Sequence, residues 1–177
     1  MNTLYLERST GDCRSGDWVS KLDLACRPDR IVVGTGPGSF AGIRSALAFA
    51  QGYAVGSGCE VLGLPSACAL AEPSRKIAVV GDARRDKFWV ALFDGFSLSG
   101  EIFQVGREAL QTAVPKDYSV VTPDAARIDA LLSDVFGPRY EGGRQPSAEG
   151  LRAFAEANPS VLVREPLPLY LNPAVRE

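Results

Sequence analysis

The sequence predicts an α/β protein in two lobes, and three observations support this fold class. Short apolar runs rich in β-branched residues alternate with segments whose apolar residues recur at three- and four-residue steps. A glycine-rich turn links one such run to such a helical segment. A turn-like EPSR sequence at residues 72–75 then divides the chain. We therefore expect an N-terminal lobe over residues 1–74 and a C-terminal lobe over residues 75–177, whose tail at 165–177 packs back on the body.

The N-terminal half is typical of alternating strands and helices. Its expected elements are a strand at Thr3–Leu6, a buried strand at Arg30–Gly34, a helix from Ser39 to about Val55, a strand at Glu60–Leu64 and a short helix from Pro65 to Ala71. In the long helix, Ile43, Ala46, Leu47 and Ala50 share one stripe. Gly56 and Gly58 are expected to end it.

The C-terminal half begins with a predicted hairpin, in which GDARRD joins the apolar runs Lys76–Val80 and Lys87–Phe93. Further strands are expected at Glu101–Val105 and Ser119–Thr122. Helices are expected at Pro123–Asp134 and Ser147–Ala157, with Thr122 and Ser147 as N-caps. The intervening FGPRYEGGRQP sequence predicts a loop. Three prolines in EPLPLYLNPAV predict an extended tail.

Composition excludes several classes of function. The 177 residues include no histidine, so the chain alone cannot build an HExxH zinc site or a triad with an imidazole base. No apolar run is long enough to span a bilayer, and four cysteines without paired spacing predict a reduced, cytoplasmic protein with no bound zinc. The formal charge of −2 gives no bulk attraction to nucleic acid. Direct contact with RNA would therefore need a local patch.

The densest motif is GTGPGSFAGIR, which runs from Gly34 to Arg44 between a buried strand and a helix start. Bare backbone N–H groups beside the positive end of a helix suit an anion such as phosphate. However, the motif lacks the GKS or GKT of a P-loop and does not match the GxGxxG spacing. Glycines are equally used for tight turns and close backbone packing, and the residues alone favour that role.

The segment GTGPGSFAGIRSALAFAQGYAVGSGCEVLGLPSACALA resembles the signature of the TsaB (YeaZ-like) family. Two later segments are similar to other motifs of that family: VVGDARRDKFWVALF to its DAR motif and following aromatic strand, and PLYLNPAV to its C-terminal tail. The resemblance implies an actin-like fold of the sugar-kinase and Hsp70 type, with two lobes built on ribonuclease-H-like sheets. It also implies a non-catalytic partner of TsaD, working with the ATPase TsaE, in the formation of threonylcarbamoyladenosine in tRNA.

The resemblance can be carried over residue by residue. Alanine stands at position 41, where the family usually has threonine, so one hydroxyl is lost. The family loop falls on Gly34, Gly36, Pro37, Gly38, Ser39, Phe40, Gly42 and Arg44. The implied partner surface includes Ala48, Phe49, Gln51 and Tyr53, for which a core helix is the alternative. The family's acidic–arginine turn falls on Asp82 and Arg84, for which a solvated hairpin turn is the alternative.

The chain departs from the family pattern near its start. Family members have a strand that ends in DTS or DTA, whereas this chain has LYLERST, with Glu7 and Arg8 at that place. Little more than twenty residues then precede Arg30, too few for the hairpin and long helix that the family has there. We therefore expect a truncated first lobe.

Two classes of function follow from these observations. The first is a partner protein that binds a TsaD homologue and TsaE, dimerises when alone, meets tRNA only indirectly and carries no cofactor or metal. The second is a phosphate-binding enzyme of the actin-like superfamily, with ATP or ADP held at Gly36–Ser39 and with Glu7 or Asp82 near a metal. A glycoprotease-like homologue would have lost its activity, because the chain has no histidine.

Overall fold

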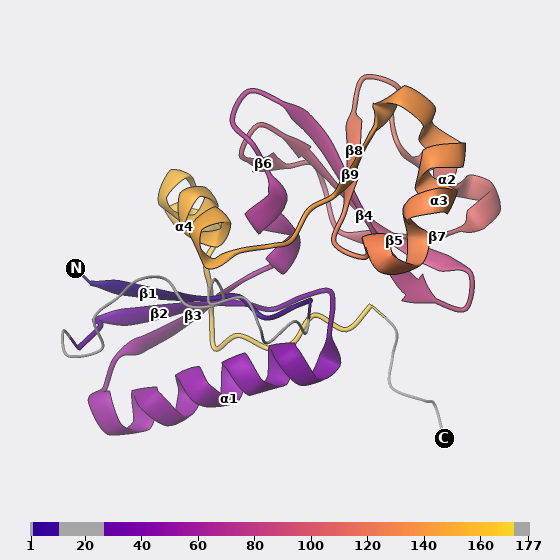
Figure 1. Ribbon diagram of the computed structural model, residues 1–177. Helices are drawn as coiled ribbons and strands as arrows, with labels where there is room; N and C mark the ends of the chain where they lie inside the picture. The colour runs from indigo at the N-terminus through magenta and orange to yellow at the C-terminus, as the bar shows by residue number, and fades with distance from the viewer. Residues whose placement is uncertain (1, 11–26, 172–177) are drawn as a thin grey trace. The chain divides into compact units, whose positions relative to one another are not determined.

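The computed structural model describes residues 2–10 and 27–171, which form two compact units (Figure 1). Of the described residues, those up to Ala69 and Pro146–Leu169 form one unit, and Leu70–Gln145 with Tyr170 and Leu171 belong to the other. Each unit has its own β-sheet, so the mixed α/β class is confirmed. The expected division at residues 74 and 75 lies close to the first change of unit, but residues 146–169 return to the N-terminal unit.

The sheet of the first unit has the strand order β1-β2-β3-β10. The strands are β1 (Thr3–Leu6), β2 (Arg30–Gly34), β3 (Glu60–Leu64) and β10 (Val163–Arg164). The first three are parallel, and β10 adds an antiparallel edge strand beside β3. In Figure 1, α1 (Phe40–Ser57) covers one face of this sheet and α4 (Ala148–Ala157) covers the other. Coverage on both faces explains why β1 and β2 are largely apolar.

The long helix α1 confirms the predicted apolar stripe. Its residues Ile43, Ala46, Leu47 and Ala50 are buried against the side chains of β1 and β2. The Ser39 hydroxyl caps the helix by accepting a hydrogen bond from the backbone N–H of Gly42. Gly58 ends α1 in the left-handed conformation that glycine adopts at low cost. Gly56, which we expected to end the helix, lies inside it.

Two other predicted helices lie in or near the first unit. The helix α4 begins after Ser147, whose hydroxyl accepts a hydrogen bond from Gly150 N–H, so the predicted cap is confirmed. Leu151 and Phe154 form its buried side. The short helix predicted from Pro65 to Ala71 is instead the 3₁₀ helix η2, Ser66–Leu70.

The sheet of the second unit has the order β6-β5-β4-β8-β9, and β7 also pairs with β5. Its strands are β4 (Lys76–Arg84), β5 (Lys87–Asp94), β6 (Ser97–Leu98), β7 (Phe103–Gly106), β8 (Ser119–Thr122) and β9 (Tyr140–Gly143). The predicted hairpin is confirmed, with β4 extended through the GDAR sequence to Arg84. The helices α2 (Arg107–Ala113) and α3 (Ala125–Phe136) contribute Leu110, Leu132 and Phe136 to a shared apolar core with this sheet.

Three sequence predictions in the second unit were wrong or incomplete. The expected loop around Tyr140 contains β9, which pairs in parallel with β8. The strand could not be recognised from the sequence, because its residues are glycine-rich and charged. Ion pairs from Glu141 to Arg75 and Arg144 hold it in place. The helix α2 was missed. Thr122 does not cap α3, because its hydroxyl accepts a hydrogen bond from Asp124 N–H, and Asp124 itself precedes the helix.

The described helices are either too short or too polar to cross a lipid bilayer.

The contact between Gly81 and Trp89 gives a test of packing in the second sheet. These residues are paired across β4 and β5, and a Cβ at Gly81 would overlap the Trp89 indole. We expect Gly81→Ala to lower the free energy of unfolding by roughly 1–3 kcal/mol through overpacking, measured by urea denaturation. Gly106→Ala is the matched control, because a Cβ there meets no atom within 4 Å. Equal stability of the two variants would contradict this account of the core.

Candidate functional site

The glycine loop joins the buried end of β2 to the start of α1. Gly34 is the last residue of β2, and Ser39 is the N-cap of α1. The backbone N–H of Thr35 donates to the Leu64 carbonyl at 2.9 Å, and Ser66 N–H donates to the Gly36 carbonyl at 2.7 Å. On the opposite side, Leu169 N–H donates to the Thr35 carbonyl at 2.8 Å. Backbone hydrogen bonds therefore hold the loop to the rest of the first unit on both sides.

Three glycines of this loop make room for the turn that follows β1. A Cβ at Gly34 would overlap the Glu7 carboxylate, one at Gly38 would overlap Ser9, and one at Gly42 would overlap the carbonyl of Arg8. Residues 7–9 can thus lie directly on the loop. A fourth glycine, Gly36, has a φ of 102°, which strongly favours glycine.

The N–H groups of the loop are largely used within the protein. Gly36 N–H donates to the Ser66 hydroxyl at 3.0 Å, Ser39 N–H donates to the Ser9 carbonyl, and Gly42 N–H donates to the Ser39 hydroxyl at 3.2 Å. An anion cradle needs several N–H groups that converge on open space. The engagement of these N–H groups within the protein favours the packing role of the glycines.

Glu7 is the buried ionisable residue of this site. Its side chain is 3% exposed, and its Oε1 accepts a hydrogen bond of 2.6 Å from Ser9 N–H. Its Oε2 is buried without a hydrogen-bond partner among the described residues. Burial raises the pKa of Glu7 and outweighs the hydrogen bonds from Ser9 and Ser66, which lower it. Glu7 therefore favours its neutral form more strongly than an exposed glutamate does.

The acidic–arginine turn belongs to the second unit. Asp82 accepts a hydrogen bond of 2.7 Å from Arg84 N–H through Oδ1 and forms an ion pair of 2.9 Å with Arg127 through Oδ2. Its backbone N–H donates to the Asp124 carboxylate at 2.9 Å. These contacts give Asp82 a structural role in the turn. Among the described residues, no three acidic or cysteine side chains gather as a metal site.

The outward side of α1 has an unusual composition for an exposed helix. Arg44 is the only charged residue in its 18 residues, and its guanidinium lies 4.9 Å from the centre of the Phe40 ring. The middle of the exposed side carries small residues and one valine. We call this set the α1 outer face: Ala41, Ser45, Ala48, Gly52 and Val55.

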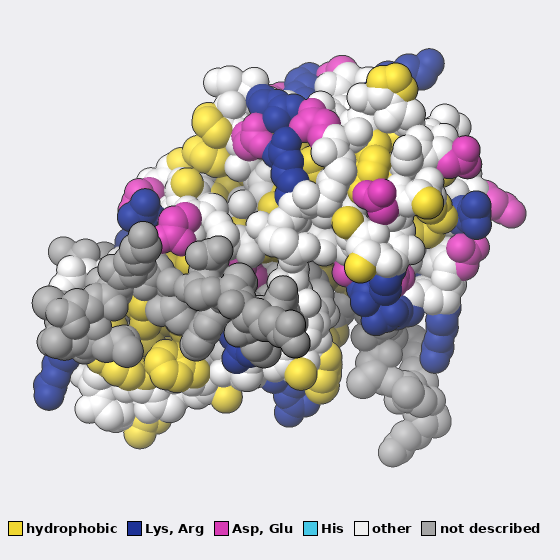
Figure 2. Space-filling view, in the orientation of Figure 1, with side chains coloured by type: hydrophobic (Ala, Val, Ile, Leu, Met, Phe, Trp, Pro, Cys, Tyr) yellow, Lys and Arg dark blue, Asp and Glu magenta, His cyan; other side chains and the backbone are white. Residues whose placement is uncertain are grey.

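The candidate partner residues lie on or beside the α1 outer face. Ala48, Phe49 and Gln51 are exposed, whereas Tyr53 is half-buried and also contacts the core. The rings of Phe49 and Tyr53 stack with their centres 6.3 Å apart. Figure 2 shows hydrophobic side chains along the part of the surface where α1 lies in Figure 1. The opposite side of α1 packs in the core of the first unit.

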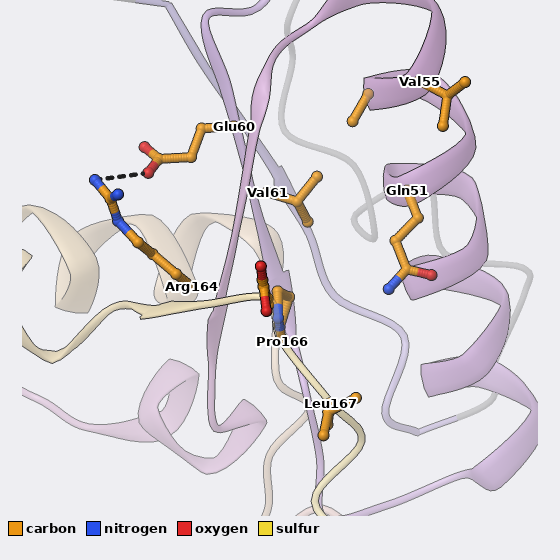
Figure 3. Close-up of a pocket in the computed structure, with 9 residues that line it drawn as sticks. Gln51, Val55, Glu60, Val61, Arg164, Pro166 and Leu167 are labelled. Carbon is orange, nitrogen blue, oxygen red and sulfur yellow. Dashed lines mark ion pairs between the residues drawn. The ribbon is translucent and has the colours of Figure 1, made fainter.

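A pocket of about 560 Å³ adjoins the C-terminal half of α1 (Figure 3). Gln51 and Val55 of α1 face it from one side, and Val61 of β3 lies between them and the segment that follows β10. Glu60 and Arg164, which also line the pocket, form an ion pair of 3.1 Å. The complete lining is Gln51, Ala54, Val55, Glu60, Val61, Arg164, Glu165, Pro166 and Leu167.

The structure thus brings the loop residues together with Glu7, Arg8, Ser9 and Ser66. The sequence indicated Glu7 and Arg8 only through their place in a family motif. It gave no signal for Ser9 or Ser66, because their role depends on backbone contacts between segments distant in the chain.

Comparison with known protein families gives a match over residues 19–135 to the TsaD family, described as tRNA N6-adenosine threonylcarbamoyltransferase. The chain belongs to this family. Among curated proteins, it is similar to the uncharacterized protein ML0378 of Mycobacterium leprae (strain TN), with 38% identity over 85 residues. That match covers 46% of this chain and 24% of the relative, so the chain spans about a quarter of that protein.

Solved structures confirm the fold that the TsaB-like motifs implied. YeaZ from Pseudomonas aeruginosa has a TM-score of 0.70 and 20% identity, with 96% of this chain and 100% of that chain covered. A protein described as similar to peptidase YEAZ from Pseudomonas aeruginosa has a TM-score of 0.67 and 20% identity, with coverages of 97% and 100%. The chain is thus a YeaZ-like member of the family in its fold. Most of the segment where the family's hairpin and long helix were expected to be missing, residues 11–26, lies outside the described residues.

The burial of Glu7 predicts a pH dependence of stability. Its pKa is raised from an ordinary value of 4.5, so between the two values the folded state holds a proton that the unfolded chain has lost. Stability should therefore fall as pH rises from 4.5 through the folded pKa. Thermal melts from pH 4 to 8 should show this fall in the wild type and a flatter profile in Glu7→Gln, which is expected to be the more stable protein at pH 8.

Glu101→Gln is the control for this measurement, because Glu101 is exposed in the second unit. It should keep the pH profile of the wild type. A Glu7→Gln profile as steep as that of the wild type would show that Glu7 does not cause the fall.

Proposed function

We propose that this protein is a TsaB-like, non-catalytic partner in tRNA N6-threonylcarbamoylation, and that it docks on a TsaD-type transferase through the α1 outer face. Membership of the TsaD family and the YeaZ-like fold support the pathway. The observation that carries the docking proposal is the composition of α1. Its exposed side combines small residues with exposed Phe49 and Val55 and lacks the dense charge of a solvated helix.

Small side chains let the backbones of two helices approach closely, which increases van der Waals contact. The exposed fractions of Val55 and Phe49 are 90% and 42%, so both can lose water-exposed apolar surface on docking. Arg44 lies at the N-terminal part of the helix and suits the polar rim of such an interface. The pocket beside Gln51 and Val55 extends this surface and could take a side chain of the partner.

The same surface can serve two complexes in turn. A second copy of this chain offers an identical helix, and a homodimer of the isolated protein would pair the α1 outer faces around a two-fold axis. Binding of the transferase would then replace this dimer. In this arrangement TsaE and tRNA are recruited by the complex, and this chain supplies neither a catalytic group nor a cofactor.

Gly52→Arg tests this docking surface with little risk to the fold. A Cβ at Gly52 meets no atom within 4 Å, and replacing glycine inside a helix should stabilise the monomer by about 0.5–1 kcal/mol. The long side chain should nevertheless hold a partner helix away. Size-exclusion chromatography with light scattering, with the TsaD homologue of the same organism, should show a defined complex for the wild type and separate peaks for Gly52→Arg.

Gly106→Arg is the matched control, because it makes the same change at an open position in the second unit. It should co-elute with the transferase as the wild type does. A stable complex with Gly52→Arg would exclude the α1 outer face as the interface, and no complex with the wild type would reject the partner role.

A further inference from the structure

The tip of the β4–β5 hairpin gathers exposed basic side chains. Arg84 and Lys87 are paired across the hairpin, and Lys87 is paired in turn with Gly106 of β7, which directly precedes Arg107. We call Arg84, Arg85, Lys87 and Arg107 the basic tip, and all four are exposed. Asp86 and Glu108 are the acidic residues next to them in the sequence. Figure 2 shows Lys and Arg side chains along this edge of the second unit.

The charged groups of the basic tip are largely available to a partner. No hydrogen bond or ion pair within the described residues engages the charged groups of Arg85, Lys87 or Arg107. Arg84 makes one loose ion pair, at 3.5 Å from Asp82, and its side chain is 65% exposed. Asp82 itself is held more closely by Arg127, at 2.9 Å. The tip thus concentrates positive charge on a chain whose formal charge is −2.

The backbone conformation at the tip is strained for the residues found there. Arg84, Arg85 and Asp86 have φ values of 69°, 55° and 58°, three consecutive left-handed residues without a glycine. Hairpins usually place Gly or Asn at such positions because other residues are strained there. Strained residues of this kind concentrate at functional sites. Two neighbouring arginines thus occupy this strained turn, and both are exposed.

We infer that the basic tip binds the phosphate backbone of RNA. Arginine presents a planar fork of N–H donors that matches a phosphate group. Adjacent strands are about 4.8 Å apart, so the tip spans roughly 10 Å across β4, β5 and β7. That width matches a few consecutive phosphates of a nucleic-acid strand.

The neighbouring aromatic side chains indicate what kind of RNA recognition this is. Phe88 and Trp89 follow the tip directly, but both are buried in the second unit and offer no ring on which a base could stack. Contacts with phosphate alone carry no sequence information. The tip therefore holds RNA in position without reading its sequence.

The choice of RNA over an acidic protein rests on the proposed function, because the complex in that proposal acts on tRNA. This inference revises the expectation that the chain meets tRNA only indirectly. It adds a local basic patch, which the charge of the whole chain does not supply.

The test uses the double variant Arg84→Gly/Arg85→Gly in complex with the TsaD homologue. Glycine relieves the left-handed strain, so the variant should melt at a higher temperature than the wild type. Complex formation is checked first by size-exclusion chromatography. Fluorescence anisotropy with tRNA should then show weaker binding, and the slope of log K against log salt should become shallower by about 1 for each phosphate that the tip no longer neutralises.

Lys116→Ala is the control, because it removes an exposed cation near the opposite end of β4, where Lys76 pairs with Asp117. It should leave tRNA affinity unchanged. An unchanged affinity and salt slope in the double variant would overturn the inference. A double variant that keeps its tRNA affinity but loses binding to polyglutamate would also overturn it, because that result would indicate an acidic protein as the partner.

If no complex forms with the wild type, the proposed function fails and the tip is tested on the chain alone. Binding of tRNA that weakens in the double variant and not in Lys116→Ala would still support the inference. Absence of any tRNA binding by the isolated wild-type chain would then overturn it.

Discussion

Close packing of residues 7–9 on the glycine loop is the contact on which the first unit depends. Gly34, Gly38 and Gly42 have no side chains at the points where Glu7, Ser9 and the Arg8 carbonyl lie. This contact joins the end of β1 to the beginning of α1. Ser39 caps the N-terminus of α1, and the apolar stripe of the helix packs against β1 and β2. The loop that resembles a phosphate site therefore brings the end of β1 into close contact with the beginning of α1.

Fixing α1 in this way leaves its other side available. Gly52 and Gly56 would weaken an isolated helix, yet an added Cβ at either would meet no atom of the described residues within 4 Å. The packing of the described residues therefore does not explain them. A partner helix that approaches closely would explain both. In the same unit, ionisation of the buried Glu7 carboxyl lowers stability, and the hydrogen bond from Ser9 N–H holds this side chain in place.

Periodicity and caps predicted much of the fold. The stripe of α1, the cap at Ser147 and the β4–β5 hairpin were evident because apolar spacing and N-cap chemistry are local properties. The strand β9 was not predictable, because Tyr140–Gly143 has no apolar alternation and is held by ion pairs from Arg75 and Arg144. At the site, the sequence indicated the glycines but not what they pack against, since the contacts of Ser9 and Ser66 join distant segments. The left-handed backbone conformation of the two arginines at the hairpin tip could not be predicted either, because it is seen only in the structure.

The most direct test of the account is site-specific photo-crosslinking in the complex with the TsaD homologue. A photoreactive amino acid would replace Ala48, at the centre of the α1 outer face, and in a second protein Glu101, which is exposed in the other unit. The account predicts a crosslinked heterodimer from position 48 and none from position 101. Co-elution with no crosslink from position 48, or with a crosslink from position 101 alone, would contradict docking through α1.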